Sequence, residues 1–364
     1  MIAFANPSLK IKKYKKEIIR AVNRTLETNS YILGPEVKKF EKNFSKYIGT
    51  KYSVGVANGT DAIEISLRSL NIGIGDEVIT VSHTAVASVS AIISAGAKPV
   101  LVDIENEYLQ IDISKVAKAI TNKTKAVLAV HLYGQSVELD GLKKICKDKK
   151  ILLIEDVSQA HGAKYKEKKL GSHGIIGCFS CYPTKNLGAL GDAGIITTNN
   201  KKIYKKMKLL REYGWKTKFY SEIHGRNSRI DEIQAAILNI KIKYLDKENK
   251  NREDIASLYK NFLDKKKFTI VKNRQNSSHV YHLFVVKVKK RKKLLDYLKK
   301  KKIATGIHYP YPVHLQKGYK KLIKTNGALS ITEKNCKNII SLPIYPELKK
   351  KTVIKIIQNL NNFN

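Results

Sequence analysis

Lys185 is the residue whose type and surroundings most clearly suggest chemistry. It is the only lysine or arginine between residues 170 and 200, in a chain that contains 69 of them. Its neighbours in CFSCYPTKNLGALGDAG are mostly small, apolar or turn-forming. An ammonium in uncharged surroundings is destabilised, so its pKa falls and the neutral amine becomes a usable nucleophile. The alternative is that Lys185 extends its charged end to solvent, as lysines commonly do.

Two further segments carry groups that could act with this amine. Asp156 ends the apolar run ILLIED, where a sheet would deliver its carboxylate to a crevice. Gln159 follows three residues later and would lie on the same side of a helical turn. In VANGTDAIE, Gly59 and Thr60 stand at an expected helix start, where free backbone N–H groups can hold a phosphate. Taken alone, each segment also fits ordinary helix capping.

Together the three features match the requirements of one cofactor. An amine that condenses with an aldehyde, a carboxylate that keeps a pyridinium protonated and a helix N-terminus that binds phosphate are what pyridoxal phosphate needs. The lack of other cations near Lys185 then makes it the only amine that can reach the aldehyde. A nicotinamide dehydrogenase is set aside, because no G-x-G-x-x-G follows the first expected strand.

The elements that must position these residues alternate between strand and helix patterns. Between residues 52 and 200 the β-rich runs are YSVGVA, EVITVS, PVLVDI, AVLAVHL, ILLIEDV, GCFSCY and GIITT. This alternation predicts an α/β fold with a mainly parallel, seven-stranded sheet flanked by helices, and functional groups at the carboxyl ends of the strands. We expect a large domain over residues 1–250, with an N-terminal helical segment, and a smaller C-terminal α/β domain over 251–364.

The net charge of +38 raises the question of a nucleic-acid partner. Only nine of the 69 basic residues are arginine, which is the preferred reader of phosphates and bases. The lysines concentrate in helix-like segments such as residues 287–302, which is typical of a solvated face. We therefore expect no nucleic acid as partner, although the field could steer an anionic substrate.

The cysteines and the apolar runs exclude other classes. Cys178 and Cys181 should point to opposite faces of a strand, and no second pair completes a zinc site. We expect no bound metal. No run approaches the roughly 20 apolar residues of a membrane span, and the start lacks a signal-peptide pattern. A cytoplasmic protein without membrane contact is the expectation.

A set of motifs extends over nearly the whole chain: ANGTDAIE, GDEVITVSHTAVAS, PVLVDI, HLYGQ, EDVSQAHGA, CFSCYPTKNLGALGDAG, LREYGW, GRNSRIDEIQAAIL, HYPYPVH and SLPIYP. With these motifs the chain resembles the DegT/DnrJ/EryC1/StrS family of sugar aminotransferases, which are pyridoxal-phosphate enzymes of fold type I. The resemblance implies that Lys185 is the Schiff-base lysine, that Asp156 pairs with the pyridine nitrogen and that Gln159 contacts the phenolic oxygen. It also implies that Gly59, Thr60 and Ser180 hold the phosphate.

Two positions qualify the resemblance. Asn227, in GRNSR, corresponds to the family's asparagine that reaches the phosphate of the neighbouring subunit, which implies a homodimer with shared active sites. Many relatives stack Phe or Trp on the cofactor after the residue matching Thr84, whereas this chain has Ala85. His83 is the candidate for covering that face of the ring.

The C-terminal part suggests a sugar rather than a second carboxylate as amino acceptor. No arginine follows Arg291, although amino-acid aminotransferases usually clamp a carboxylate with one. The segment HYPYPVH offers imidazoles and phenols, which suit a sugar, but it also fits a proline-stiffened surface loop. The resemblance makes it a sugar-facing loop. The substrate-binding candidates are Tyr182, His308, Tyr309 and His314.

We therefore predict transfer of an amino group from L-glutamate to a keto group of a nucleotide-linked deoxysugar, with Lys185 as general acid and base. HLYGQ resembles relatives that act at C3, which favours a dTDP-3-keto-6-deoxyhexose in glycan or glycoside biosynthesis. One alternative is a C4 aminotransferase acting on a UDP- or dTDP-4-keto sugar. The alternative of another class is a non-catalytic regulatory or nucleic-acid-binding member of the fold, which would most simply lack Lys185.

Overall fold

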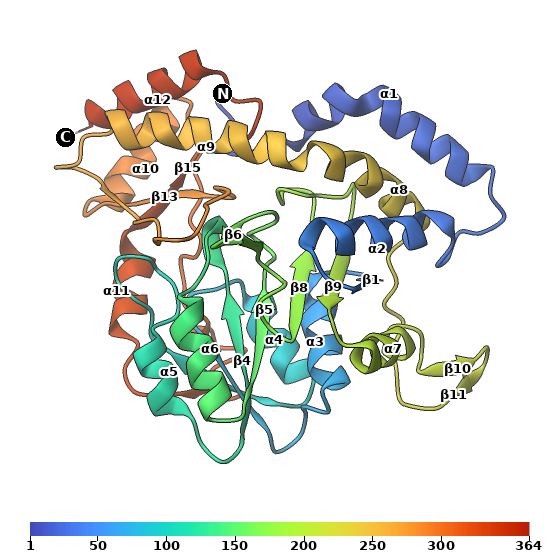
Figure 1. The fold of residues 1–364 in the computed structure, drawn as a ribbon. Coiled ribbons are helices and arrows are strands. Elements are labelled where there is room, and N and C mark those ends of the chain that lie inside the picture. The colour runs from blue at the N-terminus through green and yellow to red at the C-terminus, as the bar shows by residue number, and fades with distance from the viewer. Residues whose placement is uncertain (364) are drawn as a thin grey trace.

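In the computed structural model, which describes residues 1–363, a central sheet is covered by helices on both faces and adjoins a smaller sheet (Figure 1). The central sheet has the strand order β1-β9-β8-β5-β4-β2-β3-β14. Its strands are β1 (Tyr52–Val56), β2 (Glu77–Val81), β3 (Lys98–Val102), β4 (Thr124–Val130), β5 (Leu152–Asp156), β8 (Ile176–Ser180), β9 (Gly194–Thr198) and β14 (Lys324–Thr325).

All seven strands predicted from the sequence are present, and the sheet is mainly parallel. Strand β9 alone runs opposite to the others, pairing antiparallel with β1 and β8. The sheet has eight strands, not the seven expected, because the short β14 joins it at the edge. Lys324 and Thr325 pair in parallel with Val100 and Leu101, so a distant segment covers part of an edge that would otherwise expose unpaired backbone groups.

The two faces of the sheet form separate cores. Leu153 and Phe179 pack in one core, whereas their chain neighbours Ile154 and Cys178 pack in the other, because successive strand residues face opposite sides. Cys181 lies in the first core, which confirms that Cys178 and Cys181 point to opposite faces. One face is covered by α2 (Pro35–Ile48), α5 (Ile113–Ala119) and α6 (Leu139–Asp148), the other by α3 (Gly59–Ser69), α4 (Val86–Ser94) and α7 (Lys201–Leu210).

A smaller antiparallel sheet in the order β12-β13-β15 organises the C-terminal part. The predicted domain boundary at residues 250 and 251 lies within α9, which runs without interruption next to both sheets (Figure 1). The elements of this part are β12 (Thr269–Ile270), β13 (Phe284–Lys287), β15 (Ile339–Leu342), α9 (Leu245–Phe262), α10 (Arg291–Lys300), α11 (Ser330–Asn338) and α12 (Lys350–Asn361).

The N-terminal helical segment, α1 (Pro7–Leu26), packs on α8 (Glu232–Lys241). Ile2 and Leu9 contact the core of the small sheet, so this segment touches both parts of the chain. Two hairpins, β6 (Lys164–Tyr165) with β7 (Lys168–Lys169) and β10 (Trp215–Thr217) with β11 (Tyr220–Ser221), complete the strands.

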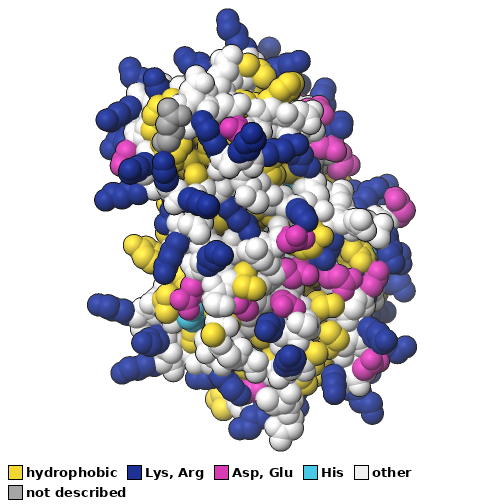
Figure 2. Space-filling view, turned by 90° about the vertical axis from the view of Figure 1, so that its left-hand side faces the viewer, with side chains coloured by type: hydrophobic (Ala, Val, Ile, Leu, Met, Phe, Trp, Pro, Cys, Tyr) yellow, Lys and Arg dark blue, Asp and Glu magenta, His cyan; other side chains and the backbone are white. Residues whose placement is uncertain are grey.

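Within residues 1–363, no helix is both long enough and apolar enough to span a membrane. Lys and Arg side chains project over all parts of the face shown in Figure 2, whereas within residues 1–363 only four Lys or Arg side chains are buried: Lys10, Arg211, Lys241 and Arg252.

Candidate active site

A cavity of about 270 Å³ opens at the carboxyl ends of the parallel strands. Asp156 reaches it from the end of β5, Ser180 from the end of β8, and Gly59 and Thr60 from the start of α3 after β1. The structure therefore brings the segments singled out in the sequence to one place, where the α/β fold was expected to present them. The lining residues include Gly59, Thr60, Thr84, Ala85, Ser88, Asp156, Ser158, Gln159, Ser180, Tyr182 and Lys185.

Lys185 lies in the loop between β8 and β9 and is partly buried. Burial lowers the pKa of its ammonium to about 8, while the carboxylate charge of Asp156 opposes this shift. A lysine with this pKa holds a much larger fraction of neutral amine near neutral pH than a solvated lysine does. The amine is therefore prepared to bond with an aldehyde and to exchange a proton afterwards.

Two buried lysines from other helices hold the loop that carries Lys185. Lys10 on α1 donates to the backbone carbonyl of Asn186 at 2.8 Å, and Lys241 on α8 donates to that of Gly188. The ammonium of Lys10 is also paired with the buried carboxylate of Glu248 on α9. Three helices thus fix the backbone next to Lys185, and burial lowers the pKa of Lys241 to about 7.

The Asp156 carboxylate is buried and oriented by its neighbours. Ser88 on α4 donates its hydroxyl to Oδ2 at 2.8 Å, and the backbone N–H of Ser158 donates to Oδ1 at 3.1 Å. The hydroxyl of Thr84 lies 3.0 Å from that of Ser88. A buried carboxylate held in this way is suited to receive a cationic N–H from the cavity.

Gly59 and Ser180 form a narrow cradle at the start of α3. A Cβ on Gly59 would lie 2.5 Å from the Ser180 Cβ, so only glycine allows this approach. The side chain of Asn58 caps the helix by accepting from the N–H of Asp61 at 2.8 Å, which leaves the N–H groups of Gly59 and Thr60 free of helical partners. This arrangement can hold a phosphate.

Gln159 bridges two segments at the cavity. Its Oε1 accepts from the N–H of Tyr133 at 2.8 Å, and its Nε2 donates to the Tyr309 hydroxyl at 3.1 Å. Burial raises the pKa of Tyr309 to about 12, so the phenol stays protonated. The structure thus places Tyr309, from the HYPYPVH segment, beside a residue that lines the cavity.

The two histidines of that segment have other partners. His308 Nδ1 lies 2.9 Å from the Ser341 hydroxyl, and its ring stacks on Phe4. His314 Nδ1 lies 2.8 Å from the Ser82 hydroxyl, and its Nε2 lies 3.3 Å from Glu333. Neither imidazole is among the lining residues of the cavity, whereas Tyr182 is among them and half exposed.

His83, the candidate for covering the cofactor face next to Ala85, is not among the lining residues of the cavity. Tyr133 donates its hydroxyl to the carbonyl of His308 at 2.6 Å, so His83 Nε2 donates to Tyr133 at 2.6 Å. His83 Nδ1 lies 3.4 Å from the thiol of Cys336. These contacts hold the imidazole between Tyr133 and Cys336, and burial lowers its pKa to about 4, so its place at the cofactor stays a prediction.

Glu155, which precedes Asp156, is held by the fold instead of facing the cavity. Burial alone would raise the pKa of its carboxyl, but hydrogen bonds from His131 and from the N–H groups of Gly171 and Gly174 lower it to about 2. Asn227 is exposed and does not line this cavity. Its assignment to a neighbouring subunit's phosphate stays a prediction.

Sequence reasoning missed Ser88, Lys10 and Lys241. Ser88 gave no signal, because its partner Asp156 is 68 residues away. Lys10 shares a helical face with Tyr14, Ile18 and Ala21 at spacings of four, four and three, and this pattern could have identified it as buried.

The residues present fit pyridoxal phosphate. One amine of lowered pKa, one buried and oriented carboxylate, and one open helix N-terminus line the same cavity. Among the described residues no cluster of His, Cys, Asp and Glu could hold a metal ion, and all four cysteines are free.

Known proteins of similar sequence match along almost the entire chain. The dTDP-3-amino-3,6-dideoxy-alpha-D-galactopyranose transaminase of Aneurinibacillus thermoaerophilus is 43% identical over 351 residues, which cover 96% of each chain. The pleiotropic regulatory protein of Geobacillus stearothermophilus is 40% identical, over 96% of this chain and 95% of that one. The dTDP-3-amino-3,4,6-trideoxy-alpha-D-glucose transaminase of Streptomyces venezuelae is 37% identical, over 98% of this chain and 94% of that one.

Solved structures share the fold. DesV of S. venezuelae superposes with a TM-score of 0.96 at 36% identity, over 99% of this chain and 97% of that chain. NtdA of Bacillus subtilis, solved with bound cofactor PMP, superposes with a TM-score of 0.89 at 31% identity, over 96% of this chain and 81% of that chain. The family model matches residues 12–361, and this chain is a member of the DegT/DnrJ/EryC1/StrS aminotransferase family.

Proposed function

We propose that this protein transfers an amino group from L-glutamate to the C3 keto group of a nucleotide-linked deoxysugar, with pyridoxal phosphate as cofactor. The observation that carries the proposal is the convergence of Lys185, Asp156 and the Gly59–Ser180 cradle on one cavity. Pyridoxal phosphate, when bound, supplies an electron sink that lets an amino group leave one carbon and join another.

Each residue of the cavity has a definite task in this reaction. Lys185 would hold the cofactor's aldehyde group with its amine and would act as the general acid and base that moves a proton. Asp156, fixed by Ser88, accepts the pyridinium N–H and keeps that nitrogen protonated. The N–H groups of Gly59 and Thr60, with the Ser180 hydroxyl, hold the phosphate.

The proposed acceptor follows from the relatives and from this chain's own charge. Two of the relatives described above are named as transaminases of dTDP-linked 3-amino sugars. A nucleoside diphosphate is anionic, and the net charge of +38 favours its approach. Tyr182 and Tyr309 present phenols at or beside the cavity, and the chain has no arginine after Arg291 that could clamp a second carboxylate.

The pleiotropic regulatory protein among the relatives does not favour a regulatory role for this chain. Lys185 and Asp156 stand in one cavity, with the lysine pKa lowered to about 8. A purely regulatory protein would have no use for an amine prepared in this way.

The enzyme we propose is a homodimer in which Asn227 completes the partner's phosphate site. The support is its exposed position, outside its own chain's cavity. Mixed dimers of Lys185→Ala and Asn227→Ala chains should regain one competent site, whereas each variant alone should be impaired. Full activity in a monomer would contradict the shared site.

Two half-reactions test the function. Glutamate alone should convert the cofactor to its amine form, and a dTDP-linked 3-keto-6-deoxyhexose should return it to the aldehyde form, as followed by absorbance. Lys185→Ala should stop both. A protein that responds to plain 2-oxo acids but to no nucleotide sugar would be an amino-acid aminotransferase.

A further inference from the structure

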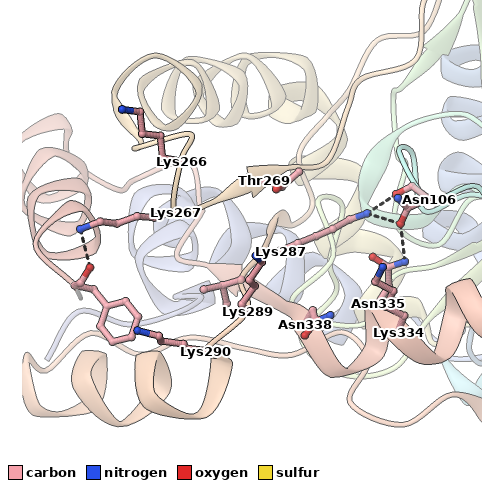
Figure 3. A pocket seen from close by; sticks show the side chains of 12 residues that line it. Asn106, Lys266, Lys267, Thr269, Lys287, Lys289, Lys290, Lys334, Asn335 and Asn338 are labelled. Carbon is pink, nitrogen blue, oxygen red and sulfur yellow. Dashed lines mark hydrogen bonds between the residues drawn. The ribbon is translucent and has the colours of Figure 1, made fainter.

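A second cavity, of about 520 Å³, shares no lining residue with the cavity around Lys185. It lies where the C-terminal part meets Asn106, in the loop that follows β3 (Figure 3). Four segments of the C-terminal part surround it: the turn after α9 together with β12, the end of β13 with its connection to α10, α11, and Phe363 after α12. Its charged lining residues are Lys266, Lys267, Lys287, Lys289, Lys290 and Lys334.

Within residues 1–363, this cavity gathers lysines and no acidic side chain in its lining. Among the described residues that line it, six are lysines and none is Asp or Glu. Lys267 donates to the backbone carbonyl of Phe363 at 2.8 Å and Lys287 to Asn106 Oδ1 at 3.0 Å, so these two ammonium groups bond to neutral oxygens. The other four ammonium groups have no hydrogen bond or ion pair within residues 1–363.

An acidic residue stands next to the cavity in the chain but has a partner of its own. Glu107, adjacent to Asn106 in the chain, is paired with Lys272 at 2.8 Å and is not a lining residue. Burial and the charge of Lys334 lower the pKa of Lys287 to about 8, while the charge of Glu107 opposes this shift. Like charges held around one hollow destabilise the folded chain, and a bound polyanion would relieve that repulsion.

We propose that this cavity binds an oligophosphate chain. Lysine ammonium groups are point charges that bind phosphate oxygens, and Thr269 and Asn338 add neutral donors at the rim. Helix α10 begins beside the cavity with no acidic residue in its first turn, so its dipole adds to the positive potential. The volume lies within the range of about 300–1,000 Å³ that is typical of small-molecule sites.

Two sources could supply such a chain. Inorganic oligophosphate would use the lysines alone. A nucleoside triphosphate would in addition lay its nucleoside on the apolar surface that Val288 and Phe363 contribute to the lining. The shared chemistry is the row of phosphates, and the two sources are separated by the experiment below.

The test compares two matched lysine pairs in the pyridoxal-phosphate-loaded protein. Lys289→Glu/Lys290→Glu reverses two exposed charges of the cavity, at the start of the ten-residue helix α10. Lys201→Glu/Lys202→Glu reverses two exposed charges at the start of α7, which also has ten residues. Both double variants change the net charge equally, so only the location differs. Calorimetric titration with inorganic tripolyphosphate is the measurement.

We expect one tripolyphosphate per chain, with an affinity at least about tenfold weaker in the α10 variant and nearly unchanged in the α7 variant. Without the anion, the α10 variant should melt at a higher temperature than the parent, because the repulsion has been removed. Titration with a nucleoside triphosphate identifies the source: tighter binding than tripolyphosphate, lost in the same variant, indicates a nucleotide, and equal binding indicates the inorganic chain. No binding at all, or equal weakening by both pairs, would overturn the proposal.

Discussion

The ammonium of Lys10 lies 2.8 Å from the backbone carbonyl oxygen of Asn186, the residue that follows Lys185. An N-terminal helix therefore holds the loop of the central lysine through a bond that spans 176 residues of chain. Because Lys10 is also paired with the buried Glu248, the same contact couples the active-site loop to α9.

Replacing Lys10 should destabilise the protein strongly. Lys10→Met leaves the Glu248 carboxylate buried without its cation, and breaking a buried pair costs about 3–5 kcal/mol. The free energy of unfolding in urea measures the loss. Lys12→Met, on an exposed position of the same helix, is the control and should leave stability nearly unchanged. Equal stabilities of the two variants would show that the Lys10–Glu248 pair contributes nothing.

Ser88 should act as a positioning residue for Asp156. Ser88→Ala removes the hydroxyl that donates to Oδ2, and a hydrogen bond to a charged group is worth about 1.5 kcal/mol or more, so the glutamate half-reaction should slow about tenfold. Its pH profile should shift as well, which a merely structural defect would not cause. Ser90→Ala, on the same helix, is the matched control. An unchanged rate and profile in Ser88→Ala would refute this role.

The pKa of Lys185 should depend on Asp156. In the protein freed of cofactor, acetylation of Lys185 should rise with pH through about 8, well below the exposed lysines. Asp156→Asn should lower that pKa further, because a nearby carboxylate favours the charged ammonium. Asp192→Asn removes an exposed carboxylate of the same cavity and should leave the titration in place. Quantitative mass spectrometry of acetylated peptides gives both curves, and a higher pKa in Asp156→Asn would contradict the assignment.

Gly59 should be indispensable for retention of the cofactor. The Cβ of Gly59→Ala would stand 2.5 Å from the Ser180 Cβ, so the cradle must widen and lose its fit to phosphate. We expect the dissociation constant of pyridoxal phosphate, measured by equilibrium dialysis, to rise about tenfold or more. Gly318→Ala, where an added Cβ meets nothing within 4 Å, serves as control. Equal retention of the cofactor in both variants would exclude the Gly59–Ser180 cradle as the phosphate site.

The sequence predicts most of the large sheet and also predicts that Lys185 and Asp156 belong to the site, because both predictions depend on local patterns. Apolar runs mark the seven strands, and the absence of other cations marks Lys185. Strand β14 could not be predicted, since Lys324 and Thr325 are an exposed polar pair that becomes a strand only by meeting β3. Lys241 was hidden for a related reason: it is the one lysine of α8 and stands at the helix's C-terminal end, where a lysine is ordinarily solvated, so its burial follows only from the packing of α8. The turn of His83 toward Tyr133 and Cys336 likewise depends on contacts between distant segments.

The central claim is that Lys185, and no other lysine among the 60 of the chain, bonds covalently with pyridoxal phosphate. The most direct measurement is borohydride reduction of the cofactor-loaded protein, followed by digestion and mass spectrometry of the peptides. We expect a single reduced pyridoxyl-phosphate adduct, located on Lys185, and none in Lys185→Ala. An adduct on another lysine, or no adduct in the parent protein, would contradict the account.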